Sequence, residues 1–250
     1  MFRKILAGTD GSDTARIAVV HAVDLAERLD ADLTVVSVYR EDPGEPIARA
    51  LLRDVENAHR GGGRLFTRAL QGNPATALVE AAAEAGSDLV VVGNVGITRS
   101  QWLGANVPRR VSHRSRASVL LVDTVQGRRA GYRRVLVGAG GSEGAARAVD
   151  VAQRLSERVG ARLTAAVFDR SSAQAERAAE GCRARWPGVE VVAGTGAPAE
   201  GLCKLAQSGE YDLLVVGSRG STGARRLIGS IREEVSRRAR TNVLLVRAAD

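Results

Sequence analysis

The sequence LLVVGSRG at residues 213–220 and the sequence LVVVGNVG at residues 89–96 decide the fold of this chain. Each is an apolar run that ends in Gly-x-x-Gly, and after a loop each is followed by a small or polar pair that opens a helical pattern, Gly229-Ser230 or Ala105-Asn106. Glycine permits a turn with positive φ and lets a ligand approach the main chain. The start of a helix offers unpaired N–H groups to an anion. We therefore interpret both stretches as candidate phosphate-binding loops.

The same blocks of sequence occur twice along the chain. Four pairs of blocks match in the same order, at residues 4–12 and 134–142, 31–36 and 161–166, 87–93 and 211–217, and 117–122 and 241–246. Repetition of this kind indicates a tandem duplication. We assign residues 1–125 to a first domain, residues 126–131 to a polar linker and residues 132–250 to a second domain.

Short apolar runs alternate with longer amphipathic segments in each copy. In the first copy we expect strands at 5–8, 33–38, 65–70, 89–92 and 119–122, with helices between them that begin after Ser12, near Pro46, at Pro74 and near Val107. Apolar strands separated by helices predict a parallel sheet covered on both faces. Right-handed crossovers make such a sheet doubly wound, and its ligands bind where the strand order reverses. The predicted fold class is α/β, with two tandem doubly wound five-stranded parallel-sheet domains.

Composition limits the class of protein. Hydrophobic residues make up 44% and charged residues 26% of the 250, which is typical of a soluble globular protein. No apolar run approaches the roughly 18 residues of a membrane helix, and Asp10 interrupts the apolar segment that follows the basic start. We expect a cytoplasmic protein without a membrane partner.

Charge and metal-ligating residues argue against two further classes. The net charge is +8, but the arginines are interleaved with acidic residues, and aromatic residues make up 3% of the chain. Nucleic-acid binding requires clustered cations, and single strands require aromatic stacking surfaces, so nucleic acid is not the expected partner. The two cysteines and three histidines lack the spacing of metal ligands. We expect packed, reduced thiols, no metal held by protein ligands and no catalytic residue.

The combination of these motifs resembles the universal stress protein family. A strand running into AGTDGS at residues 7–12, a later VVGxxG and a Gly-Ser pair that opens the last helix are all present, and the likeness extends over the whole chain twice. The resemblance implies a Rossmann-like domain of the adenine-nucleotide alpha hydrolase type. It also implies ATP as the ligand, with or without Mg²⁺, a role in stress, and pairing of domains through their last strands.

Carried over residue by residue, the resemblance implies a set of nucleotide contacts in each copy. In the first copy they are Gly8, Asp10, Val38, Gly93, Gly96, Asn106 and Val107. In the second copy they are Gly217, Gly220, Gly229, Ser230 and Ile231. Ala105 replaces the later family glycine in the first copy, Gly140 replaces the acidic residue in the second, and both loops are one residue short. We expect the second copy to bind phosphate with weaker selection of base or ribose, and the first to keep adenosine contacts with weaker phosphate binding.

Each candidate residue also has a purely structural interpretation. The glycines can serve strand ends and turns, Asp10 can form an Asx turn, and Asn106 and Ser230 can cap their helices. Two functions therefore stay open: a non-catalytic ATP-binding stress protein with at least one occupied domain, or a nucleotide-free interaction module. The chain lacks Gly-x4-Gly-Lys-[Ser/Thr] and an evident base, so we do not expect a dedicated nucleotide hydrolase, although slow hydrolysis stays open. The expected partners are an adenine nucleotide and the chain itself, through residues 118–122 and 242–246, with a homodimer as a further option.

Overall fold

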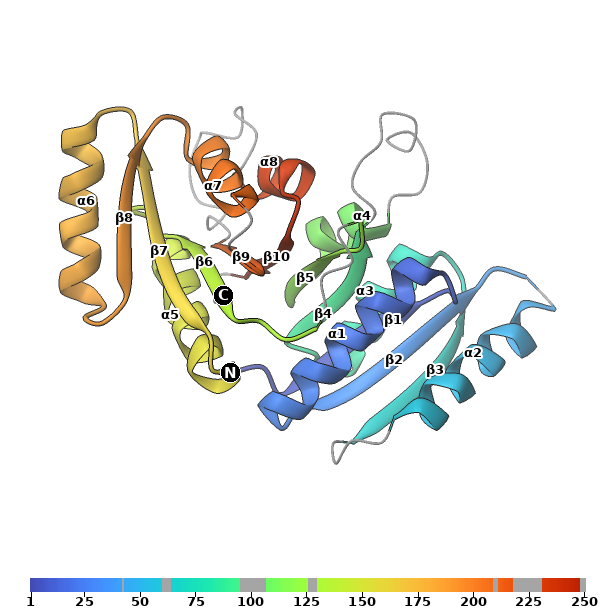
Figure 1. Ribbon diagram of the computed structural model, residues 1–250. Helices are drawn as coiled ribbons and strands as arrows, with labels where there is room; N and C mark the ends of the chain where they lie inside the picture. Colours follow the sequence, from blue (N-terminus) through green and yellow to red (C-terminus); the bar gives the residue numbers. More distant parts are fainter. Residues whose placement is uncertain are drawn as a thin grey trace. The chain divides into compact units, whose positions relative to one another are not determined.

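The computed structural model describes residues 1–41, 43–59, 64–94, 107–125, 130–208, 211–217 and 231–247 (Figure 1). The chain divides into two units, Met1–Gly131 and Tyr132–Asp250, each with its own strands, helices and buried core residues. None of the helices in the described ranges is long and apolar enough to cross a membrane.

Within its described residues, unit 1 contains five strands and four helices. Its elements are β1 (Lys4–Thr9), α1 (Asp13–Leu29), β2 (Asp32–Tyr39), α2 (Gly44–Ala58), β3 (Leu65–Gln71), α3 (Pro74–Glu84), β4 (Leu89–Asn94), α4 (Val107–Arg114) and β5 (Ser118–Asp123). The strands are all parallel and follow the order β3-β2-β1-β4-β5.

Unit 2 repeats this arrangement. Its elements are β6 (Arg134–Gly138), α5 (Glu143–Val159), β7 (Arg162–Asp169), α6 (Ser172–Arg185), β8 (Glu190–Thr195), α7 (Pro198–Gln207), β9 (Leu213–Gly217), α8 (Ile231–Arg238) and β10 (Asn242–Val246). These strands are also parallel, in the order β8-β7-β6-β9-β10.

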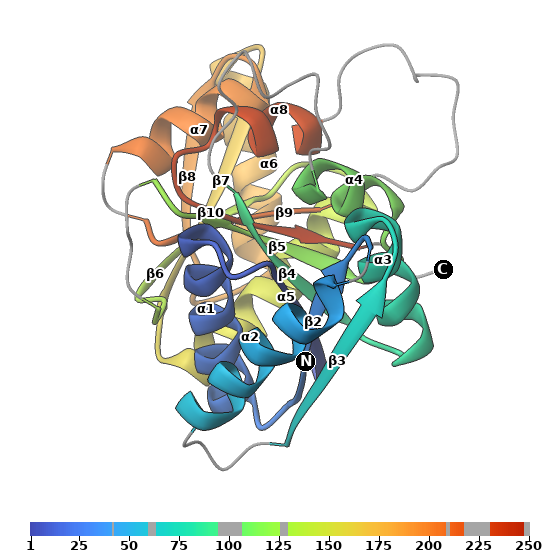
Figure 2. The same cartoon turned by 90° about the vertical axis from the view of Figure 1, so that its right-hand side faces the viewer.

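Helices cover both faces of the sheet in each unit. In unit 1, α1 and α2 pack on one face of the strands, and α3 and α4 lie together on the other (Figure 2). The strand order reverses between β1 and β4 in unit 1 and between β6 and β9 in unit 2. The predicted fold class, a doubly wound parallel sheet in each copy, is therefore confirmed. The reversal points are where such sheets bind ligands.

Local sequence explains where the helices begin. The Ser12 hydroxyl caps α1 by accepting a hydrogen bond from the Ala15 N–H at 3.2 Å, and Ser142 caps α5 through the Ala145 N–H at the same distance. The helix start predicted at Ser12 is thus confirmed. The predicted strand bounds agree with the observed ones within two residues, and the cores of β1, β2, β4 and β5 are buried and apolar, whereas β3 is partly exposed. In each unit the first strand, β1 or β6, ends at the carboxyl-terminal side of the sheet, just before the serine that caps the next helix.

At the amino-terminal ends of the strands, one carboxylate in each unit connects two neighbouring strands. Asp88, before β4, accepts hydrogen bonds from the N–H groups of Arg3 and Lys4 at 2.8 and 3.1 Å. Asp212, before β9, accepts from Arg133 and Arg134 at 2.8 and 2.9 Å. The repeated Asp therefore holds the start of β4 against β1 in unit 1 and the start of β9 against β6 in unit 2.

We predict that Asp88→Ala and Asp212→Ala each lower the free energy of unfolding by about 1–3 kcal/mol, because two backbone N–H groups lose a charged acceptor. Urea denaturation followed by circular dichroism measures the change. Asp54→Ala, at an exposed position on α2, is the matched control. Equal effects of the Asp88 and Asp54 changes would contradict the role assigned to the repeated carboxylate.

Candidate functional site

A pocket of about 380 Å³ opens at the carboxyl ends of β6, β7 and β9 in unit 2. It lies at the point where the strand order of this unit reverses. Its walls come from the turn after β6, the end of β7, the last residues of β9, and the starts of α5, α7 and α8. Doubly wound sheets bind their ligands at this location.

The turn after β6 leaves the main chain open to a ligand. Gly140 and Gly141 both line the pocket, and a Cβ added at either would meet no atom within 4 Å. Ser142 follows and caps α5, whose first turn also lines the pocket. The first N–H groups of a helix favour negative charge or hydrogen-bond acceptors nearby. This wall can therefore accommodate the polar part of a ligand.

Gly217, predicted as a phosphate contact, has a structural requirement of its own. A Cβ at Gly217 would lie 1.9 Å from the Gly144 carbonyl oxygen and 2.3 Å from its carbon. At Gly93 in unit 1, a Cβ would lie 2.6 Å from the carbonyl oxygen of Thr14. In both units the end of the central strand passes directly against the first turn of a helix, and a side chain there would separate them. The first glycine of each Gly-x-x-Gly is therefore required for packing.

Gly8 is also in close contact with a helix. A Cβ there would lie 2.9 Å from Leu78 Cδ1 of α3, and the repeat-related Gly138 would meet Leu202 Cδ1 of α7 at 2.9 Å. The two units thus share this packing. The atoms that a Cβ at Gly8 would meet belong to a leucine side chain and not to the backbone, so packing requires this glycine less strictly than Gly93 or Gly217. Its predicted contact with a nucleotide stays a prediction.

Asp10 is exposed and forms the predicted Asx turn. Its Oδ1 accepts a hydrogen bond from the Ser12 N–H at 3.0 Å. Gly11, between them, has φ of +80°, in the region that favours glycine. The structural interpretation of Asp10 is confirmed. A carboxylate has further acceptor capacity, so this turn is compatible with a ligand contact.

The corresponding turns of the two units differ in what covers them. A Cβ at Gly11 would lie 2.7 Å from Leu51 Cδ2 of α2, whereas Gly141 is open. In unit 2 the helix that corresponds to α2 is α6, and it presents Ala178 to the pocket. A leucine side chain thus packs over the turn in unit 1, and a single methyl group lines the same region in unit 2.

The other predicted site residues fall in three groups. Gly217 and Ile231, the first residue of α8, line the same pocket in unit 2. In unit 1, Val38 lies near the end of β2, and Val107 is the first residue of α4, both partly exposed. Five predicted contacts lie outside the described residues: Gly96, Asn106, Gly220, Gly229 and Ser230.

The structure adds pocket residues that the sequence interpretation did not include. Phe168 and Asp169 come from the end of β7, and Ala178 comes from α6. The offset of 130 residues that relates blocks 4–12 and 31–36 to blocks 134–142 and 161–166 also pairs Val38 with Phe168, so the repeat itself contained the information for Phe168. Asp169 pairs with Tyr39, which has different chemistry and gave no indication of a site. Ala178 is a small residue on a helix, a type that no motif singles out.

Ionisable groups are few around this pocket. Among the described residues that line it, Asp169 is the one ionisable side chain.

Both cysteines are free and buried. The pKa of the Cys203 thiol is raised to about 11, mainly by burial and also by the charge of Glu234, while Arg238 has a smaller opposing effect. The thiol is therefore protonated at neutral pH and a poor nucleophile. No group of three or more metal-ligating side chains occurs within the described ranges.

Comparison with known proteins identifies relatives of both halves. A family model described as the universal stress protein family matches residues 1–123 and 166–247. Universal stress protein Rv1636 of Mycobacterium tuberculosis is 34% identical over 49% of this chain and 97% of its own length. Universal stress protein MJ0531 of Methanocaldococcus jannaschii is 30% identical over 49% of this chain and 82% of its own length. The crystal structure of a universal stress protein from Archaeoglobus fulgidus DSM 4304 shares the fold, with a TM-score of 0.76 and 20% identity, over 99% of this chain and 97% of that one.

We predict opposite outcomes for two glycines of the same pocket. Gly217→Ala should lower the free energy of unfolding by about 1–3 kcal/mol, because its Cβ would overlap the Gly144 carbonyl group. Gly140→Ala, in open space, should change it by less than about 0.5 kcal/mol. Thermal or urea denaturation of the two variants measures the difference. A Gly217→Ala protein as stable as the Gly140→Ala protein would show that the strand and helix can separate freely.

Proposed function

Because this chain belongs to the universal stress protein family, we propose that it is a non-catalytic stress protein that binds an adenine nucleotide, with ATP held in unit 2. The observation that carries the proposal is the pocket at the reversal point of the unit 2 sheet. Its volume of about 380 Å³ falls within the range of small-molecule sites. Its mixture of apolar side chains and open main chain suits a heterocyclic base with polar substituents.

The pocket has two walls of different character. Phe168, Ala178 and the end of β7 form a largely apolar wall that suits the base and sugar. Gly217 and Ile231 lie on the side from which the predicted phosphate contacts Gly220, Gly229 and Ser230 continue in sequence. We therefore place the adenosine toward β7 and the phosphates toward Gly217 and Ile231. Mg²⁺ would be bound chiefly through the phosphates, as is usual for this ion.

Binding without dedicated turnover fits the residues present. The described lining contains a single carboxylate and no Lys or His. Phosphoryl transfer depends on cationic groups and a positioned nucleophile, and the sequence lacks the Lys-containing loop of P-loop enzymes. We thus propose a role as a nucleotide-dependent switch or carrier. The predicted cytoplasmic location and the pairing of residues 118–122 with 242–246 stay predictions.

One observation favours the alternative, a nucleotide-free interaction module. Gly93 and Gly217 are required for packing of a strand against a helix. The Asx turn explains Asp10. These family residues would therefore persist in a protein that had lost its ligand. Unit 1, where Leu51 covers the turn after β1, fits this alternative better than unit 2.

Identification of a copurified nucleotide tests the proposal. The purified chain is denatured, and the released small molecules are identified by mass spectrometry. In parallel, the melting temperature is measured with and without millimolar Mg-ATP. We expect the denatured protein to release an adenine nucleotide. Alternatively, when Mg-ATP is added to the nucleotide-free protein, we expect the melting temperature to increase by about 5 °C. The absence of both would reject nucleotide binding and leave the interaction module.

We further predict that Ala178→Leu weakens ATP binding by about tenfold or more, because the larger side chain fills part of the pocket. Isothermal titration calorimetry measures the affinity. Ala173→Leu, at an exposed position on the same helix, is the matched control and should bind ATP as the unchanged chain does. Full affinity in the Ala178→Leu protein would place the nucleotide elsewhere.

A further inference from the structure

Asp169 is a carboxylate at the end of the second strand of unit 2. It is the last residue of β7, is partly buried, and lines the pocket beside the open turn after β6. The two strands are neighbours, since the Ala139 N–H donates to the Ala166 carbonyl oxygen at 2.9 Å. Asp169 therefore reaches the pocket from the strand next to the one that carries Gly140.

The carboxylate near the carboxyl ends of the strands lies at the end of a different strand in each unit. Unit 1 has Asp10 after its first strand and Tyr39 at the end of its second. At the matching positions unit 2 has Gly140 and Asp169. The hydroxyl group of Tyr39 donates a hydrogen bond to Glu45 Oε2 of the adjacent helix α2 at 3.3 Å. Unit 2 has thus lost the acidic residue after the first strand and has one at the end of the second.

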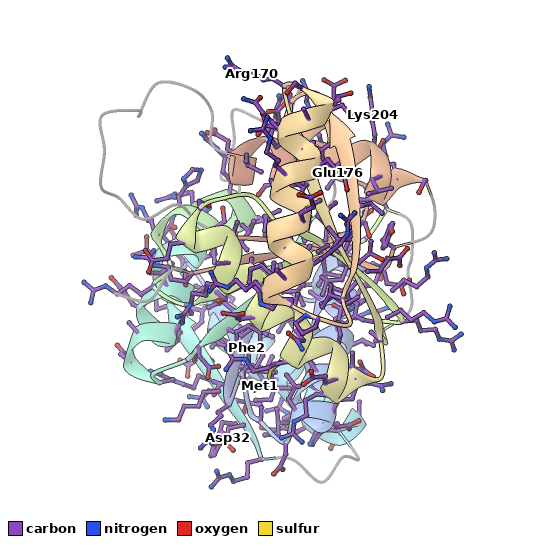
Figure 3. The ribbon with its side chains drawn as sticks, turned by 90° about the vertical axis from the view of Figure 1, so that its left-hand side faces the viewer. Met1, Phe2, Asp32, Arg170, Glu176 and Lys204 are labelled. Atoms are coloured by element: carbon purple, nitrogen blue, oxygen red, sulfur yellow. The ribbon has the colours of Figure 1, made fainter. Side chains whose placement is uncertain are left out.

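Local contacts hold Asp169 in place. Its Oδ1 accepts a hydrogen bond from the Arg170 N–H at 2.6 Å, and its carbonyl oxygen accepts one from the Gly196 N–H at 2.8 Å. The Arg170 side chain is exposed at the end of the unit (Figure 3). Within the described ranges no Arg or Lys side chain forms an ion pair with Asp169. The carboxylate therefore keeps acceptor capacity that the residues described by the structure do not use.

A partly buried carboxylate without a cationic partner favours ligands that donate hydrogen bonds. An ionised carboxylate has two oxygens and about four acceptor sites, and hydrogen bonds to it are stronger than those between neutral groups. Adjacent hydroxyl groups of a sugar can donate to both oxygens. In dinucleotide-binding doubly wound folds an acidic residue about 20 residues after the glycine-rich turn serves this purpose toward a ribose. An anionic group beside Asp169 would instead be repelled.

We infer that Asp169 binds the ribose hydroxyl groups of the nucleotide in unit 2 and replaces the carboxylate that is missing at Gly140. This inference rests on the proposed function. It assigns the sugar end of the ligand to β7 and the phosphate end to the side of Gly217. It also makes the second copy selective for ribose, whereas the loss of the acidic residue at Gly140 by itself predicts weaker selection.

The test compares ATP with 2′,3′-dideoxy-ATP by isothermal titration calorimetry, on the unchanged full-length chain and on Asp169→Ala. The unchanged chain should bind ATP about tenfold more tightly than the dideoxy compound. Asp169→Ala should lose that preference, with ATP affinity reduced about tenfold and dideoxy-ATP affinity nearly unchanged. Glu180→Ala, which removes an exposed carboxylate from α6, is the control for net charge and should keep the preference.

The outcomes separate the two proposals. If the unchanged chain binds both nucleotides equally, or if Asp169→Ala weakens both by the same factor, the role of Asp169 is overturned and nucleotide binding stands. If the unchanged chain binds neither compound, the proposed function itself is rejected. Circular dichroism and the melting temperature of the Asp169→Ala protein establish that the variant is folded before its affinities are compared.

Discussion

The close approach of a central strand to the first turn of a helix is the constraint on which the rest of each unit depends. In unit 2, Gly217 leaves no room for a Cβ against the Gly144 carbonyl group, and in unit 1 Gly93 meets Thr14 in the same way. This contact holds the N-terminus of α5 at the sheet edge where the strand order reverses. The open turn after β6, the helix N–H groups and the end of β7 then surround one pocket. Gly217 thus shapes the pocket by allowing β9 to pack against α5, independently of any contact with a ligand.

Two copies of one fold have diverged at the positions that surround this edge. Leu51 packs over the turn in unit 1, whereas Gly141 and Ala178 leave the corresponding region of unit 2 open. The acidic residue stands after the first strand in unit 1 and at the end of the second strand in unit 2. After duplication each copy is free to change while the other keeps its pocket. The differences support one nucleotide site per chain, in unit 2.

The fold could be predicted from the sequence because its determinants are local and repeated. Buried strand segments such as residues 89–92 are apolar throughout, and serines mark the helix starts, so each copy confirms the other. The site was predicted less completely. Asp169 and Ala178 reach the pocket from two further elements, and only the assembled sheet brings them beside Gly140. The sequence also could not distinguish a glycine needed for a ligand from one needed for packing, since that depends on the distance to Gly144.

A crystal structure of the full-length chain with a non-hydrolysable ATP analogue tests the central claim most directly. We predict one nucleotide per chain, at the carboxyl ends of β6, β7 and β9, with its ribose at Asp169 and its phosphates on the side of Gly217. A nucleotide bound in unit 1 with the unit 2 pocket empty at saturating concentration would contradict it.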